Sequence, residues 1–364
     1  MIMIKKFIEN AGWPRVIIGL FLLGLFIAAP FVGVRVDTSL SDTLVRFGMN
    51  AVMVLAMIPM VQSGCGLNFG LPLGIIAGLL GATLSIELNE KVLAWCGQYV
   101  NAAAWAAPLG FASAIVMALP IAAVLGFFYG KLLNRVKGDE MMIATSVGFS
   151  SVAFMCIAWL LLPYHNPTMI WGYAGAGLRT TISVDGYWFH VLSDFLAFTP
   201  FGLDHLYVPT GMILFFAFMA FLVWVFMRSK TGTAMTAVGS NPEFARASGV
   251  NVDRMRVISV MLSTMLGAVG ILVYEQSFGF IQLYMGPFYM ALPAVASILL
   301  GGASVNKASI LNVAVGTFLF QGILTMTPSV INSVLQTDMS EVIRLIVSNG
   351  MILYALTRKV RVKR

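Results

Sequence analysis

Residues 240–249 read SNPEFARASG, and this polar stretch stands between two long apolar runs. Asn241 is a favourable N-cap residue, Pro242 suits the first helical position, and the carboxylate of Glu243 complements the positive end of a helix. Gly249 is the residue type that most often follows the last turn of a helix. The stretch therefore predicts a helix of about two turns with a defined start and a defined stop.

The predicted helix, 242–248, carries one large apolar side chain, that of Phe244. A helix this short is marginal in isolation, so it needs a surface to lie on. Two surfaces are compatible with the pattern: the lipid headgroups, or a pocket on a cytosolic partner protein. We favour the partner protein, because a plain linker needs neither two capping residues nor a protruding Phe.

The surrounding chain is far more apolar than a soluble protein. It is 59% hydrophobic and 10% charged, with a mean hydropathy of +0.90, whereas soluble domains carry about 25% charged residues. The net charge of +7 is spread among apolar spans, without the basic stripe of a nucleic-acid-binding protein. The sequence therefore predicts an all-α, polytopic protein that is embedded in membrane lipid and binds no nucleic acid.

Stretches of about 20 apolar residues indicate membrane-crossing helices. We expect about ten of them in a single transmembrane domain, 1–364, at 16–34, 47–61, 67–86, 111–133, 141–162, 207–227, 257–275, 291–300, 310–326 and 342–356. The second and eighth are short, and the third begins with Gly and Pro. Short or broken helices are tolerated where protein or water covers the backbone, so we expect these to line a central path. A cleaved signal peptide is the alternative for the first stretch, but its apolar run is longer than a typical signal core.

Lys and Arg residues are distributed unevenly between the predicted loops. With both termini in the cytoplasm, seventeen of the 22 basic residues lie on the inner side, as the positive-inside rule requires. The other five are assigned to the outside: Arg35, Arg46, Lys91, Arg179 and Arg344. This orientation makes 228–256 a cytoplasmic loop and 163–206 the longest external segment.

The external segment is rich in Trp, Tyr and Phe. Trp and Tyr favour the headgroup level of a membrane, so part of the segment, 188–198, is expected to form a helix that lies at the interface. Anchoring at the interface is one interpretation of the segment, and docking of an external partner is a second, compatible one.

The centres of the predicted spans lack acidic residues. A charged group at mid-membrane usually marks an ion or proton route, so its absence weighs against an ion-coupled carrier and suits a neutral solute. The candidates for lining a translocation path are Gln62, Ser63, Asn68, Phe69 and Gln276. Satisfying the backbone of broken helices is the alternative role of the polar side chains among them.

The sequence shows no pattern typical of an enzyme or a metal site. Cys65, Cys96 and Cys156 have no metal-ligand spacing and are expected to pack as small apolar residues. We find no nucleophile motif, zinc signature or phosphate-binding loop. We therefore predict no catalytic residue, no metal and no cofactor in this chain.

Two stretches resemble segments of ABC importer permeases of the branched-chain amino acid, ribose and simple-sugar group. AVGSNPEFARASGVNVDRMRVISVMLS, 237–263, looks like the cytoplasmic coupling segment, with Phe244 where Ala is frequent and matches at Ala237, Gly239, Asn241, Ala245, Arg246 and Gly249. The stretch 294–324 is similar to a loop and helix of that family at Ala296, Gly301, Gly302, Ser304 and Gly316, with Asn306–Lys307 in place of the usual second Gly pair. QSGCGLNFGLPLG, 62–74, is a looser match to a short Gly-bearing motif of the family.

The resemblance implies a multi-pass permease subunit in a bacterial inner membrane that imports a small neutral polar solute. A sugar or a nucleoside is favoured, and a branched-chain amino acid is the alternative. The family further implies a second copy or a homologous permease chain, two cytosolic ATPase subunits that hold ATP and Mg, and an external solute-binding protein.

In that setting the short helix sits in a cleft of the ATPase and passes its closure to the spans as rigid-body motion, which gives alternating access. The residues expected to couple the two proteins are Asn241, Pro242, Glu243, Phe244, Ala245, Arg246 and Gly249. Two other functions are compatible with the sequence: a stand-alone secondary carrier or facilitator, and a membrane scaffold for a cytosolic enzyme.

Overall fold

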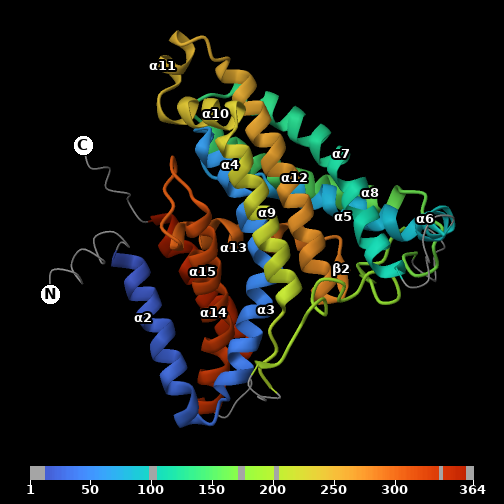
Figure 1. The fold of residues 1–364 in the computed structure, drawn as a ribbon, viewed down its shortest axis with the longest axis vertical. Helices are drawn as coiled ribbons and strands as arrows, with labels where there is room; N and C mark the ends of the chain where they lie inside the picture. The colour runs from blue at the N-terminus through green and yellow to red at the C-terminus, as the bar shows by residue number, and fades with distance from the viewer. Residues whose placement is uncertain (1–12, 98–104, 171–176, 201–204, 336–338, 358–364) are drawn as a thin grey trace.

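The computed structural model of the chain is a bundle of helices (Figure 1). The structure describes residues 13–97, 105–170, 177–200, 205–335 and 339–357. The terminal segments 1–12 and 358–364, which carry part of the predicted inner basic charge, lie outside the described residues. So do 171–176 and 201–204, which belong to the predicted external segment.

Each of the ten predicted spans falls on a helix. In chain order these helices are α2 (Trp13–Ala28), α3 (Val36–Leu55) with α4 (Met57–Gln62), α5 (Leu71–Glu87), α7 (Ala106–Arg135), α8 (Glu140–Leu161), α9 (Thr210–Arg228), α12 (Val252–Phe278), α13 (Gly286–Leu300), α14 (Ile310–Leu335) and α15 (Ser340–Thr357). The shorter elements between them are η1 (Ala29–Val32), α6 (Asn89–Cys96), β1 (Thr181–Ser183), α10 (Lys230–Ser240), α11 (Pro242–Ala247) and β2 (Phe280–Gln282). The predicted all-α fold is confirmed.

Seven helical stretches in the described part of the chain are long and apolar enough to cross a membrane. The pair α5 and α6, bent by 66°, makes an eighth when it is taken as one span. Helix α13 has 15 residues, and α15 carries charged and hydroxyl side chains along its first turns. A short helix such as α13 is what the sequence predicts for an element that lines a path rather than facing lipid.

The predicted start of the second span is wrong. Helix α3 begins at Val36, eleven residues before the predicted span, so Arg46 lies within the helix and not in a loop. Arg344 likewise lies within α15, near its start. A hydropathy scan trims such helix ends, because charged side chains that face an aqueous cavity lower the local hydropathy just as a loop does.

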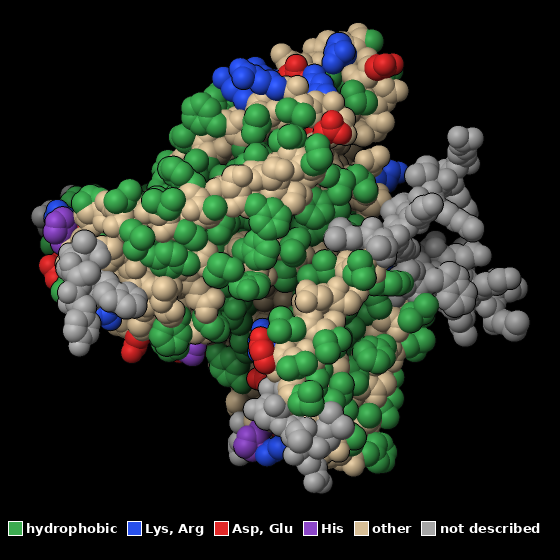
Figure 2. Space-filling view, turned by 180° about the vertical axis from the view of Figure 1, so that it is seen from behind, with side chains coloured by type: hydrophobic (Ala, Val, Ile, Leu, Met, Phe, Trp, Pro, Cys, Tyr) green, Lys and Arg blue, Asp and Glu red, His purple; other side chains and the backbone are tan. Residues whose placement is uncertain are grey.

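Helix α12 occupies the middle of the bundle, where it packs against α3, α5 and α7 (Figure 1). Of its apolar window 67% is buried, against 17% for α8, so α12 belongs to the core and α8 to the periphery. Figure 2 shows apolar side chains spread over the flanks of the bundle and charged ones gathered at the end that carries α10 and α11. This distribution is expected of a bundle whose flanks meet lipid.

The described part of the external segment folds onto the outer end of α12. Strand β1 pairs antiparallel with β2, so that Ile182 lies opposite Ile281 and both are buried. The predicted interfacial helix at 188–198 is wrong: those residues form turns, and Trp188 is fully buried, 6.1 Å from the ring of Phe111. The Trp therefore serves the protein core and is not available to the headgroup layer.

Tyr207 closes the same external segment. Burial raises the pKa of Tyr207 to about 12, and the nearby Asp194 carboxylate adds to the shift. The hydroxyl group therefore stays protonated at neutral pH and donates a hydrogen bond to the carbonyl oxygen of Ser193. This contact ties the residues before α9 to the turns that cover α12.

Candidate functional site

The short helix predicted after Asn241 forms. Helix α11 spans Pro242–Ala247, and the side-chain oxygen of Asn241 accepts a hydrogen bond from the backbone N–H of Phe244 at 3.0 Å. At the other end the N–H of Gly249 donates to the carbonyl oxygen of Arg246, and Gly249 has φ +82°. Both ends of the helix are therefore fixed by local hydrogen bonds, as N-cap and C-terminal Gly chemistry requires.

Helix α11 rests on the chain through one residue and exposes the others. Ala245 is buried against Val238 and Val252, which together form a small apolar cluster with residues around them. The remaining predicted coupling residues are exposed, and the side chain of Phe244 is 66% exposed. Of the predicted set, Ala245 thus faces inward, and the rest form a polar surface with one aromatic ring in it.

Helix α10, which precedes α11, contacts the turn that follows α4. A Cβ built on Gly239 lies 2.2 Å from the carbonyl oxygen of Gln62 and 2.8 Å from the backbone nitrogen of Gly64. These distances leave no room for a side chain, so the backbones of the two segments are in direct contact. Helix α10 therefore bears on 62–70, the turn to which four of the five predicted path residues belong.

The turn 62–70 is tied to α12 by side-chain hydrogen bonds. The hydroxyl groups of Ser63 and Ser259 lie 2.6 Å apart, and the amide of Asn68 donates to the hydroxyl of Ser263 at 2.8 Å. Tyr129 on α7 donates to the oxygen of the same Asn68 amide at 3.3 Å. Ser63 is 1% exposed and Asn68 is 0% exposed, so in this conformation the two side chains join helices and do not face an open channel.

The two other path candidates at the turn contact neighbouring elements. The amide of Gln62 donates to the carbonyl oxygen of Ala308 at 2.6 Å, which links the turn to the start of α14. Phe69 is half-buried and lies beside Gly148 of α8 and Phe288 of α13. The turn is therefore in contact with α7, α8, α10 and α12 and with the residues just before α14.

Gln276 lies apart from these four residues, at the outer end of α12. Its side-chain oxygen accepts a hydrogen bond from the backbone N–H of Leu192 at 3.1 Å, and its amide nitrogen donates to Ser193 at 3.3 Å. The side chain is fully buried. Its contacts hold the external segment on α12, so the structure does not bring Gln276 to the 62–70 turn.

An ion pair fixes the N-terminal end of α12. The guanidinium group of Arg256 donates to the carboxylate of Glu140 at the start of α8, and its Nε lies 3.3 Å from the sulfur of Cys65. Asp253, one turn earlier, pairs with Lys137 after α7 at 2.7 Å. The base of α12 is thus held to α8, to α7 and to the turn on which α10 bears.

A polar cavity of about 530 Å³ opens at the outer half of the bundle, among α3, α12, β2, α13, α14 and α15. Its lining mixes charged, amide and aromatic side chains: Arg46, Asn50, Tyr274, Phe278, Gln282, Tyr289, Gln321, Glu341 and Arg344, with Ser348 and four apolar residues. Acidic and basic side chains are visible together in the hollow of the lower half of Figure 2. A concave site with a few convergent polar groups is the usual form of a small-molecule site.

Sequence reasoning missed this cavity, although a signal for it exists. Arg46 and Asn50 are four residues apart, and Glu341, Arg344, Leu345 and Ser348 recur at helical spacing. Such spacing places side chains on one face of a helix. The pattern was not recognised because the charged residues were assigned to external loops.

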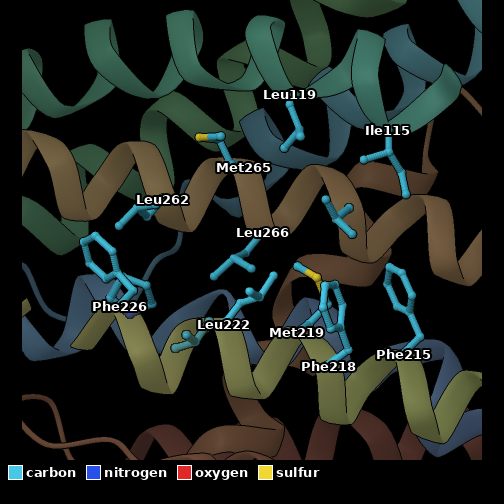
Figure 3. A pocket seen from close by; sticks show the side chains of 13 residues that line it. Ile115, Leu119, Phe215, Phe218, Met219, Leu222, Phe226, Leu262, Met265 and Leu266 are labelled. Atoms are coloured by element: carbon cyan, nitrogen blue, oxygen red, sulfur yellow. The ribbon is translucent and has the colours of Figure 1, made fainter. Parts of the chain in front are cut away.

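A second cavity is purely apolar. It has a volume of about 420 Å³ and lies among α7, α9 and α12. Figure 3 shows Leu119 of α7, Phe218 of α9 and Leu266 of α12 around it, and every lining residue is Pro, Ile, Leu, Phe, Met or Val. It offers no hydrogen-bond partner to a polar solute, which makes the outer polar cavity the better candidate of these two.

Comparison with known protein families assigns the chain to one of them. Residues 39–356 match the model of the branched-chain amino acid transport system permease component. The chain belongs to this permease family. The matched residues include the cytoplasmic helices, the 62–70 turn and the outer cavity.

Its relatives are permeases of import systems. The autoinducer 2 import system permease protein LsrD of Yersinia enterocolitica is 23% identical over 334 residues, which cover 89% of this chain and 88% of the relative. The corresponding LsrC of Escherichia coli is 23% identical over 340 residues, or 90% and 81% of the two chains. The galactose/methyl galactoside import permease MglC of Haemophilus influenzae is 32% identical over 110 residues, or 29% and 32%. No solved structure matches the chain.

The predicted resemblance to ABC importer permeases is thereby confirmed. With its membrane-length helices, this permease is a multi-pass protein of the inner membrane. Its family is one of transport subunits and not of catalytic enzymes.

Proposed function

We propose that this permease imports a small hydroxyl-bearing solute and that the cytoplasmic loop 228–256 receives the motion of a partner ATPase. The contact between Gly239 and the 62–70 turn is the observation that carries the proposal. A force applied to α11 passes through the apolar cluster under Ala245 into α10 and from there to a turn bonded to α12. The contact at Gly239 is between backbones, and the side chains that continue the route are buried, so little of the motion is lost to side-chain rearrangement.

The partners of the proposal follow from the family. Two cytosolic ATPase subunits hydrolyse ATP with Mg, a second copy or a homologous permease chain completes the path, and an external binding protein delivers the solute. Relatives are named for the import of autoinducer 2 and of galactose, which supports a sugar-type solute. The coupling residues are those of α11 and its caps: Asn241, Pro242, Glu243, Phe244, Ala245, Arg246 and Gly249.

Phe244 is the residue whose substitution tests the proposal. An exposed aromatic side chain that fills a partner pocket typically contributes about 2 kcal/mol or more to association, roughly 30-fold in Kd. We expect Phe244→Asp to leave the folded permease intact and to abolish both co-purification of the ATPase subunit and ATP-dependent uptake into vesicles. The matched variant Phe244→Leu keeps an apolar anchor and is expected to retain most of both.

Two results would contradict the proposal. One is wild-type uptake by a sequence-verified Phe244→Asp complex. The other is uptake by the permease alone, driven by an ion gradient with no ATPase present, which would indicate the stand-alone carrier.

A further inference from the structure

Two arginine side chains from different helices line the outer cavity. Arg46 comes from α3 and Arg344 from α15, and both belong to the lining of the same 530 Å³ space. Two like charges therefore border the same cavity.

Neither arginine is neutralised by direct contact. No ion pair found within the described ranges includes Arg46 or Arg344. Asp42 lies one turn before Arg46 on α3, and Glu341 lines the cavity one turn before Arg344 on α15. Like charges repel in a partly desolvated space, and an anionic group bound between them would remove that cost.

The neutral lining points to the rest of the ligand. Gln321 is 5% exposed, and its amide has no hydrogen-bond partner in the part of the chain that the structure describes, although it borders the cavity. Asn50 and Gln282 add two more amides to the wall, and Tyr274 and Tyr289 add aromatic rings with hydroxyl groups. Several neutral hydrogen-bonding groups beside an aromatic surface suit a hydroxyl-bearing carbon skeleton better than a purely aliphatic one.

We infer that the outer cavity binds the solute through an anionic oxygen group, a carboxylate or a phosphate, on a small hydroxyl-bearing molecule. Arg46 and Arg344 hold the anionic group, and the amides of Gln282 and Gln321 contact the hydroxyl groups. Guanidinium groups suit this role because their planar fork matches both carboxylate and phosphate oxygens. The inference rests on the proposed function and makes it more specific.

The inference departs from the neutral solute that the sequence favoured. That expectation rested on the lack of acidic residues at the span centres and assigned Arg46 to the outside, whereas Arg46 lies within α3. An ionisable residue inside a membrane helix generally faces a water-filled cavity and marks a solute route. The structure therefore removes the ground for neutrality without affecting the family assignment.

Ligand binding to the purified permease in lipid nanodiscs tests the inference. The probes are D-galacturonate for a carboxylate, D-galactose 6-phosphate for a phosphate, D-galactose as the neutral counterpart and L-leucine as the zwitterion without hydroxyl groups. We expect one or both of the anionic sugars to bind, by isothermal titration and by a rise in Tm, at concentrations where galactose and leucine have no effect. Which of the two binds distinguishes carboxylate from phosphate.

Variants of the lining residues sharpen the test. Arg46→Gln and Arg344→Gln are each expected to weaken anion binding by about tenfold or more, the scale of one charge-assisted hydrogen bond. Glu341→Gln removes the opposing charge and is expected to strengthen binding. Arg35→Gln, an exposed external arginine outside the cavity whose partner is Asp37, is the matched control and should change nothing.

Three outcomes would overturn the inference: equal binding of galactose, binding of leucine alone, or wild-type anion binding by both arginine variants that retain the wild-type unfolding profile. Since binding is measured without the ATPase, its failure is separate from a failure of the Phe244 experiment. Anion binding without Phe244-dependent coupling would leave the cavity assignment intact and reject only the coupling proposal.

Discussion

At the scale of single residues, Gly239 brings the backbone of α10 directly against the turn that follows α4. A Cβ there would lie 2.2 Å from a carbonyl oxygen that belongs to the backbone of Gln62. A backbone atom cannot move aside as the end of a flexible side chain can. The glycine therefore fixes how closely α10 approaches the turn.

Gly239→Ala is expected to force the two segments apart. Overpacking of this kind costs about 1–3 kcal/mol, and we expect a lower Tm together with weaker coupling of ATP hydrolysis to uptake. The control is Gly24→Ala on α2, where a Cβ would meet nothing within 4 Å. Unchanged Tm and uptake in Gly239→Ala would show that the contact does not transmit motion.

Sequence reasoning at this scale succeeded where the cause is local. The caps of α11 were predictable because Asn241, Pro242 and Gly249 act on backbone groups within four residues of themselves. The position of Arg46 was not predictable in the same way. Whether an arginine ends a span or lines a cavity depends on side chains from α12, α13, α14 and α15, which the local sequence does not contain.

At the scale of helices, two ion pairs hold the base of α12. The side chains of one pair are much less exposed than those of the other. The Arg256–Glu140 pair has side chains 10% and 18% exposed, whereas those of the Lys137–Asp253 pair are 44% and 58% exposed. Removing one partner of a buried pair leaves an uncompensated charge, while an exposed pair is screened by water. The two pairs therefore make a natural comparison.

Arg256→Gln is expected to destabilise the protein by about 3–5 kcal/mol, measured as unfolding in detergent with denaturant. The double variant Arg256→Met with Glu140→Leu should recover part of that loss, because it leaves no buried charge. Lys137→Gln should change stability by less than about 1 kcal/mol. If Lys137→Gln and Arg256→Gln proved equal, the tie between α12 and α8 would not depend on burial.

Helix positions were predictable at this scale because about 20 apolar residues leave few alternatives in a membrane. The turns that replace the predicted helix at 188–198 were not predictable. A Trp in the sequence, such as Trp188, does not reveal whether its side chain faces the lipid headgroups or the protein core. Its burial against Phe111 is a long-range contact, and no local periodicity reports it.

At the scale of the whole molecule, the orientation predicted from the sequence places the two ends of α12 on opposite sides of the membrane. The cytoplasmic end joins α11, and the outer end meets β2 and the external segment. The two candidate sites, the surface around Phe244 and the outer cavity, therefore lie at opposite ends of one bundle. Transport between them requires the bundle to open at each end in turn.

Cysteine labelling checks this arrangement. In a background with Cys65, Cys96 and Cys156 replaced by Ala, we expect a membrane-impermeant maleimide to label Asp185→Cys in intact cells. Phe244→Cys, which is equally exposed to solvent in the structure, should react only in inverted vesicles. Labelling of Phe244→Cys in intact cells would reverse the orientation and reject the coupling proposal with it.

The pairing of β1 with β2 has a further mechanical consequence. Gln282 forms part of a hydrogen-bonded ladder with Thr181 and at the same time forms part of the wall of the outer cavity. Paired strands shift together, since sliding one alone breaks its backbone hydrogen bonds. An external binding protein that docked on 181–183 would thus change the shape of the outer cavity. By the same coupling, a solute in the cavity would change the affinity for that binding protein.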